Sequence, residues 1–300
     1  MVKKVGRLTL VLIIEENLIR NLVLKLKLSY RPEIKGLRKK EKVLIIGGNG
    51  QIGSELYSYL KKKNINTFKT SRNTKLTNEK TFYFDLEKPS YKFLKNQFTA
   101  VVICASATTI ASIEKKPRKF RNINVINTIK LIKELSKNKI FIIFLSSNSV
   151  FDGKKQFYKY SDKTCPTNLY GKYKCEVEEY LNYNLKKKSC ILRLTKVISK
   201  NTPIIEYWNK ELNNGKNIWA YKDRFFAPVK ILKVIQTIEI LIKKKQNGIF
   251  QLGGNKEMSF FEFAKYFYKK FPTFIKLIKS KAINKSGTIT YNSLKTHLPN

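Results

Sequence analysis

The sequence predicts an α/β fold of the Rossmann type, in which a doubly wound parallel sheet is joined by a smaller C-terminal substrate-binding lobe. Short apolar runs, beginning with Val43 to Ile46, alternate with segments whose apolar residues recur at helical spacing. The runs are apolar almost throughout, as is typical of strands covered on both faces. A glycine-rich turn follows the first run. Because such alternation builds right-handed βαβ units, we expect a parallel sheet.

The predicted elements follow in order along residues 42–200, the expected nucleotide-binding domain. A helix carrying Ile52, Leu56 and Leu60 opens after the glycine turn, and a later helix carries isoleucines at 123, 126, 129 and 132. Further strands are expected at residues 100–103, 140–145 and 190–194. Residues 201–300 are less regular, with a helix near 234–241 and a strand near 249–252. We expect them mainly to form the substrate-binding lobe, interwoven with the first domain.

Residues 1–41 do not share this pattern and are expected to form a poorly ordered N-terminal extension. Their apolar run at residues 8–14 is interrupted by Glu15 and Glu16, so it is too short to span a bilayer. No small-residue cleavage site follows it, which disfavours a signal peptide. We therefore predict neither a membrane span nor a secretion signal.

The formal net charge of +40 favours an anionic partner. Lysine is nevertheless spread through every segment, without a confined basic arm, zinc-finger spacing or an RNA-binding aromatic motif. This distribution resembles a compositional bias more than a binding face. We therefore expect a phosphate-bearing small substrate, and we do not expect nucleic acid to be a partner.

Cysteine and histidine usage limits the chemistry further. The four cysteines form no CxxC pair, which disfavours a disulfide framework or a zinc site and favours reduced thiols in the cytoplasm. The single histidine is His297, so neither a Ser-His-Asp triad nor a multi-histidine metal centre is expected. Proton transfer must therefore fall to other side chains, and we predict no metal.

The glycine-rich turn predicts a dinucleotide phosphate site. Gly47 permits the tight turn, Gly50 lets a pyrophosphate approach the backbone, and Gly53 allows close packing of the helix. The N–H groups at the start of the helix, at Gln51 and Ile52, remain free for phosphate oxygens.

Cofactor choice is predicted from the end of the second strand. NAD-selective sites place an acidic residue there for the ribose hydroxyls, whereas this chain has no Asp or Glu between Glu55 and Glu79. Ser71 and Arg72 could instead receive a 2′-phosphate. The sequence therefore favours NADP, with NAD as the alternative.

Candidate catalytic residues are Ser147, at the end of the 140–145 strand, and Tyr170 with Lys174 on a predicted helix. Residues four apart share a helix face. A phenol can protonate the oxygen of a ketone that accepts a hydride, a serine hydroxyl can polarise that carbonyl, and an ammonium group can favour the phenolate for the reverse reaction. Six other tyrosines also precede a lysine by four positions, so the position of Tyr170 after the serine-bearing strand, rather than spacing alone, supports this assignment.

From Lys42 onward the chain resembles the extended short-chain dehydrogenases, and within them the dTDP-4-dehydrorhamnose reductase branch. The resemblance is carried by the glycine turn, by Ser-Ser-x-x-Val-Phe-Asp-Gly at 146–153 and by Pro-x-Asn-x-Tyr-Gly-x-x-Lys at 166–174. It implies that an NADPH- or NADH-dependent enzyme reduces a nucleotide-linked 4-keto sugar for activated-sugar or polysaccharide synthesis. It also implies cofactor contacts at Asp85, Leu86, Ala105, Ser106, Tyr170 and Lys174. Substrate contacts are implied at Asn148, Ser149 and Arg193.

The chain departs from that branch at positions expected to face the sugar. Its Ser146-Ser147-Asn148-Ser149 replaces a usual Ser-Thr-Asp-Tyr, and Ala111 replaces a usual Asp. The nature of the sugar is therefore open. A sugar-nucleotide epimerase or dehydratase, a non-catalytic nucleotide-binding regulatory subunit of the same fold, and a homodimeric assembly also remain open.

Overall fold

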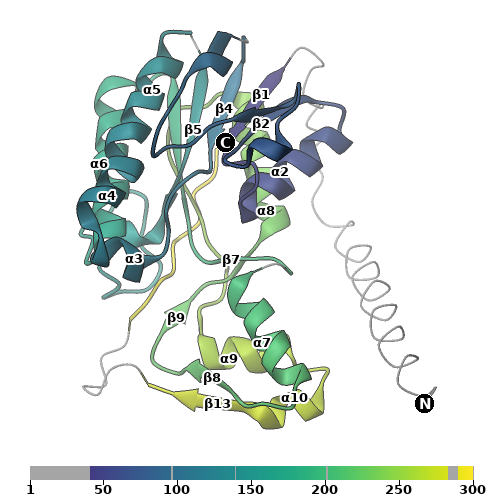
Figure 1. Cartoon of the computed structure of the whole chain (residues 1–300). Coiled ribbons are helices and arrows are strands. Elements are labelled where there is room, and N and C mark those ends of the chain that lie inside the picture. The colour runs from purple at the N-terminus through teal and green to yellow at the C-terminus, as the bar shows by residue number, and fades with distance from the viewer. Residues whose placement is uncertain (1–40, 96, 139, 201, 283–289, 300) are drawn as a thin grey trace, which may run out of the picture. The chain divides into compact units, whose positions relative to one another are not determined.

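The computed structural model describes residues 41–299, apart from 96, 139, 201 and 283–289 (Figure 1). The predicted N-terminal extension lies outside the described residues except for Glu41. Among the described residues, no helix is both long and apolar enough to cross a bilayer.

A seven-stranded sheet forms the centre of the described structure, in the order β11-β6-β5-β4-β1-β2-β3, and every pairing is parallel. The predicted Rossmann-type fold is therefore confirmed. The predicted strand at 140–145 begins one residue later and runs on to Ser147, which brings the serine pair onto the strand itself. The bounds are β1 (Lys42–Ile46), β2 (Asn66–Ser71), β3 (Thr81–Tyr83), β4 (Ala100–Ile103), β5 (Phe141–Ser147), β6 (Ser189–Leu194) and β11 (Gly248–Leu252).

Helices cover both faces of this sheet (Figure 1). One face is covered by α3 (Ile110–Lys115), α4 (Pro117–Arg121), the π-helical turn η4 (Asn122–Asn127), α5 (Thr128–Ser136) and α6 (Leu169–Asn184). On the other face lie α2 (Gln51–Lys62) and α8 (Ile231–Lys244). The last two helices are joined by the buried Glu239 carboxylate, which accepts hydrogen bonds from Tyr59 and Lys63. The strand order reverses between β1 and β4, where parallel sheets open a crevice at their carboxyl ends.

A smaller lobe has its own apolar core, in which Trp208, Phe226 and Phe263 are buried. Its elements are α7 (Pro203–Asn213), β8 (Ile218–Tyr221), β9 (Phe225–Phe226), β12 (Met258–Ser259), α9 (Phe260–Phe267), α10 (Pro272–Leu277) and β13 (Ile278–Lys281). Between the lobe and the sheet, β7 (Val197–Ile198) pairs with β10 (Val229–Lys230). Helix α8 and strand β11, although late in the chain, belong to the main sheet layer.

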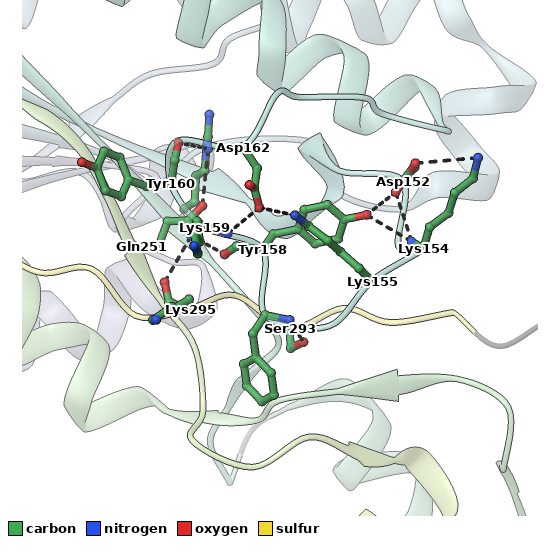
Figure 2. Close-up of polar contacts among 12 residues, drawn as sticks. Asp152, Lys154, Lys155, Tyr158, Lys159, Tyr160, Asp162, Gln251, Ser293 and Lys295 are labelled. Atoms are coloured by element: carbon green, nitrogen blue, oxygen red, sulfur yellow. Dashed lines mark hydrogen bonds and ion pairs between the residues drawn. The ribbon is translucent and has the colours of Figure 1, made fainter.

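Residues 290–299, here termed the C-terminal segment, run from the lobe back to the β11 edge (Figure 1). Isolated bridges join Thr290 to Arg224, Leu294 to Tyr158 and His297 to Gln251. The His297 ring stacks on Tyr160 at a centroid distance of 3.9 Å. Figure 2 shows the polar contacts where this segment meets the loop at 152–162, including Ser293, which accepts a hydrogen bond from the Phe157 amide. The segment therefore contacts both the lobe and the main sheet.

Candidate active site

The glycine turn closes tightly between β1 and α2. Gly47 has φ +85°, and its N–H donates to Thr70 Oγ1 at 2.9 Å. A Cβ atom on Gly53 would lie 2.3 Å from the Gly47 carbonyl oxygen, whereas one on Gly50 would meet that oxygen at an ordinary 3.5 Å. Gly53 is therefore needed for packing, and Gly50 leaves open space above the turn. No side chain in the described structure caps α2, so its first N–H groups are free for an anion.

A pocket of about 590 Å³ opens at the carboxyl ends of β1, β2, β3 and β4. It brings together most of the residues predicted to contact the cofactor, namely Gly47, Gly50, Ser71, Arg72, Asp85, Leu86, Ala105 and Ser106. Arg72 is exposed there. The Ser71 hydroxyl accepts a hydrogen bond from Asn49 Nδ2 at 2.8 Å. The size and shape of this region suit the adenosine and phosphate portions of a dinucleotide.

Five residues of the predicted cofactor set do not line this pocket, namely Gln51, Ile52, Gly53, Tyr170 and Lys174. The Gln51 side chain points instead toward the connection after β7, where Nε2 donates to Thr202 Oγ1 at 2.9 Å and to Ser199 Oγ at 3.0 Å. Only the backbone N–H of Gln51 is therefore available to contact the cofactor. The amide side chain fixes the start of α2 against the entry to the lobe.

Ser147 and Tyr170 are brought together by the packing of α6 against the end of β5. A Cβ atom on Gly171 would lie 2.0 Å from the Ser149 carbonyl oxygen, so only glycine permits this approach. Asn168 caps the helix by accepting a hydrogen bond from the Gly171 N–H at 2.9 Å. The Tyr170 hydroxyl consequently lies near the Ser147 and Ser106 hydroxyls, close enough for both to lower its pKa. Burial raises the pKa of Tyr170 to about 12, an effect that the two serine hydroxyls partly oppose.

Lys174 lies one turn further along α6, with 6% of its surface exposed. Its Nζ donates to the Leu145 carbonyl oxygen at 2.9 Å and lies 5.7 Å from the centre of the Tyr170 ring. Burial lowers the pKa of Lys174 to about 8, although the Glu178 carboxylate acts in the opposite direction. The ammonium group is therefore a stronger acid than an ordinary lysine.

Asn124, on the π-helical turn, holds the loop that follows β4. Its side chain accepts a hydrogen bond from the Ala107 N–H and donates one to the Ala107 carbonyl, each at 2.9 Å. The Ser106 hydroxyl also donates to Asn124 Oδ1 at 3.2 Å. Because Ser106 also lies near the Tyr170 hydroxyl, Asn124 links the pocket to Tyr170. Such one-turn π-bulges are frequent at functional sites.

The residues predicted to contact substrate separate into two groups. Asn148 and Ser149 adjoin Ser147, whose Oγ donates to Ser149 Oγ at 3.2 Å. Asn148 Nδ2 donates to Asn292 Oδ1 at 2.8 Å, so the C-terminal segment reaches the same region. The position of Asn292 was not predicted, because nothing in the sequence links it to a residue so far away.

Arg193 is the exception, and its predicted substrate contact is corrected by the structure. Its side chain is only 3% exposed and forms an ion pair with Glu178 at 2.7 Å. Its NH1 group donates to the Tyr160 carbonyl oxygen at 3.2 Å. The guanidinium group is therefore turned into the protein interior, because it neutralises a buried carboxylate.

The fold is that of the extended short-chain dehydrogenases, with a parallel sheet and a glycine turn after its first strand. The Ser147, Tyr170 and Lys174 side chains are grouped as in the pattern predicted from the sequence. The RmlD substrate binding domain model matches residues 41–290, and the chain belongs to that family. Among solved structures, the chain resembles dTDP-4-dehydrorhamnose reductase from Bacillus anthracis in complex with NADP, with 19% identity, a TM-score of 0.74 and coverage of 87% of this chain and 91% of that one. It also resembles UDP-glucose 4-epimerase from Thermotoga maritima, with 16% identity, a TM-score of 0.71 and coverage of 85% and 90%.

Curated relatives differ in their described roles. Methionine adenosyltransferase 2 subunit beta from Mus musculus is 26% identical over 237 residues, covering 74% of this chain and 70% of the relative. Spore coat polysaccharide biosynthesis protein SpsK from Bacillus subtilis is 26% identical over 225 residues, covering 74% and 77%. One of these names thus refers to a subunit of methionine adenosyltransferase, and the other to polysaccharide biosynthesis.

Proposed function

We propose that this protein is an NADPH-dependent reductase of a nucleotide-linked 4-keto sugar, with NADH as the alternative reductant. The observation that carries the proposal is the placement of the Tyr170 hydroxyl between Ser147 and Ser106, next to Lys174 and beside the dinucleotide pocket. A binding module has no need for a phenol held by two serines above an ammonium group. The name of the B. anthracis neighbour, which includes both the reductase and NADP, supports the same reading.

The side chains divide the proton chemistry between them. A bound reduced nicotinamide would supply hydride to the carbonyl carbon. Ser147 donates a hydrogen bond to the carbonyl oxygen, and Tyr170 transfers its proton to that oxygen as negative charge develops there. With a pKa of about 12, Tyr170 is protonated throughout the neutral range, as a proton donor must be. Lys174 lies near enough to stabilise the phenolate that remains.

Arg72 and Ser71 would hold the 2′-phosphate that distinguishes NADP from NAD. Both line the pocket, and Arg72 is exposed to an incoming anion. Asn148 and Ser149 would contact the sugar. Asn292 would hold the Asn148 side chain in place by accepting its hydrogen bond. We further propose a cytoplasmic role in activated-sugar or polysaccharide synthesis, with a small substrate rather than nucleic acid, and a homodimeric assembly. The name of the SpsK relative supports the pathway class.

The second candidate is a non-catalytic regulatory subunit, which is favoured by the similarity to methionine adenosyltransferase 2 subunit beta. One experiment separates the two proposals. NADPH absorbance would be followed with a panel of 4-keto sugar nucleotides that differ in base and sugar. The reductase proposal predicts oxidation that depends on one of the sugars. Tight NADPH binding without oxidation by any panel member would favour the regulatory subunit, and interconversion of a 4-hydroxy sugar nucleotide without net oxidation would favour an epimerase.

A further inference from the structure

A fully buried ion pair lies behind the catalytic side chains, between α6 and β6. Glu178 and Arg193 are each 3% exposed. Arg193 Nε donates to both carboxylate oxygens at 3.1 Å, and NH2 donates to Oε2 at 2.7 Å. Ser146, which adjoins Ser147 on β5, donates from its hydroxyl to Glu178 Oε1. The carboxylate is therefore held in one position by two strands.

Arg193 is itself held by the loop and strand next to the C-terminal segment. Its NH1 group donates to Tyr160 O at 3.2 Å and to Gln251 Oε1 at 3.4 Å. Gln251 is fully buried, and its Nε2 donates to Tyr158 O at 2.8 Å and to Lys295 O at 3.2 Å, as Figure 2 shows. The ion pair is thus part of a polar network that leads away from the cleft, so its role is to hold other groups rather than to touch substrate.

Glu178 follows Lys174 by four residues on the same helix, so the two side chains lie on one face of α6. Within the described structure, Lys174 otherwise faces the Phe144 ring at 4.5 Å, the Tyr170 ring and the Cys104 thiol. The negative charge of Glu178 or of Cys104 would raise the pKa of Lys174, against the larger effect of burial. Burial raises the pKa of Cys104 to about 12, so this thiol is neutral near pH 7, and Glu178 is left as the group whose effect on Lys174 opposes burial.

We propose that Glu178 is a positioning residue whose carboxylate, fixed by Arg193 and Ser146, keeps the buried Lys174 side chain in its ammonium form and directed at Leu145 and Tyr170. This inference rests on the proposed function, because it concerns the same Tyr170 and Lys174 pair. An ammonium group without a counter-charge loses its proton at lower pH in so apolar a site. Arg193 in turn stabilises the buried Glu178 carboxylate, which would be poorly solvated beside only Lys174 and the Ser146 hydroxyl.

The test compares Glu178→Gln with Glu179→Gln. Glu179 is the next residue on α6 but is exposed, so it controls for the chemistry of the substitution. The first measurement is the pH titration of the Lys174 side chain by NMR, with ¹³Cε-labelled lysine and with Lys174→Arg to assign the signal. We expect the titration midpoint to fall by about one unit in Glu178→Gln and to stay in place in Glu179→Gln. This measurement needs no substrate, so it decides the inference even if no sugar is reduced.

The second measurement is the pH profile of NADPH oxidation. The ammonium form is lost as pH rises through the pKa of Lys174, so activity has a basic limb, and Glu178→Gln moves that limb to lower pH. For a shift of one unit, activity falls about fivefold at pH 8 and by less than twofold at pH 6. Glu178→Asp, which keeps the charge, restores most of the activity at pH 8.

A Lys174 midpoint in Glu178→Gln equal to that of the parent would overturn the inference, as would an equal loss of activity at every pH. Because Glu178→Gln leaves Arg193 unpaired in the interior, it can also weaken folding. The double variant Glu178→Gln with Arg193→Met removes both charges and avoids that problem. The same fall in the Lys174 midpoint is expected there, and an unchanged midpoint would again count against the role of Glu178.

Discussion

The Tyr170 hydroxyl has two serine partners, and this arrangement decides how the residue acts. Ser147 belongs to β5, whereas Ser106 belongs to the loop after β4 and is fixed by Asn124. Sequence reasoning grouped Ser147, Tyr170 and Lys174, and these side chains lie close together in the structure, because strand ends and helix spacing are local properties. It placed Ser106 only with the cofactor, because a contact between residues so far apart in the chain leaves no local pattern.

Replacing Tyr170 by phenylalanine removes only the hydroxyl. We expect turnover to fall by roughly 100-fold or more, which is the usual scale for a positioned acid, while NADPH affinity stays within a few-fold of the parent. Turnover and cofactor fluorescence titration measure the two effects. Tyr183→Phe is the matched control: it lies on the same helix, also precedes a lysine by four positions, and is 91% exposed. Equal turnover of the parent and Tyr170→Phe would show that another group donates the proton.

Arg72 carries the prediction on cofactor choice. We expect the parent to bind NADPH more tightly than NADH, and Arg72→Ala to weaken NADPH binding by roughly tenfold or more, as loss of a charged hydrogen bond does, with little change for NADH. Arg118→Ala, also an exposed arginine but outside the pocket, should change neither affinity. Equal affinities of the parent for the two cofactors would contradict the assignment of the 2′-phosphate site. Calorimetry of the parent and the two variants with both nucleotides measures the six dissociation constants.

At the scale of elements, two parts of the site depend on the close approach of a helix to the end of a strand. Helix α2 packs against the turn after β1 through Gly53, and α6 packs against the turn after β5 through Gly171. In each case a Cβ atom would overlap a carbonyl oxygen, so the glycine sets the distance between the two elements. The need for Gly53 was predicted from its motif, whereas that for Gly171 became visible only when the two elements were in place.

Gly50 and Gly53 provide a paired test of the turn. Gly50 has extended backbone geometry with φ −75°, and a Cβ atom there would make only an ordinary contact, so Gly50→Val should fold normally yet lose NADPH binding because the side chain occupies the path of the pyrophosphate. Gly53→Val should instead lower the melting temperature, since its Cβ would overlap the Gly47 carbonyl. Thermal unfolding and NADPH titration distinguish the two effects. Undiminished NADPH affinity in a folded Gly50→Val protein would refute the phosphate site.

At the scale of the whole described molecule, the main sheet was predictable and the closure by the C-terminal segment was not. Buried strands can be predicted from apolar runs in the sequence, because a parallel sheet is covered on both faces. The C-terminal segment has no such run, and it is held by backbone bridges, by Asn292 and by the ring of His297. Contacts of this kind depend on three-dimensional position, so no periodic pattern records them.

The stacking of His297 provides a stability test of that closure. Its ring lies between Tyr160, at a centroid distance of 3.9 Å, and Phe250, at 5.9 Å. We expect His297→Ala to lower the free energy of unfolding by about 1–2 kcal/mol, because two aromatic contacts are lost, and to increase proteolysis within the C-terminal segment. Denaturant unfolding and limited proteolysis provide the measurements, with His297→Phe as the variant that keeps the stack. An alanine variant as stable and as resistant as the parent would show that the bridges alone hold the segment.

The return of residues 290–297 to the β11 edge also sets an order of events during synthesis. A ribosome makes the chain from its N-terminus, and domains can begin to fold while later residues are still absent. The strands β1 to β6 are then available early. Asn148 cannot meet Asn292, and Gln251 cannot form its bridge to His297, until residues 292 and 297 have left the ribosome. A nascent chain can therefore form its dinucleotide pocket before the region around Asn148 is closed, and the substrate side of the cleft is completed only after residues 290–297 have emerged.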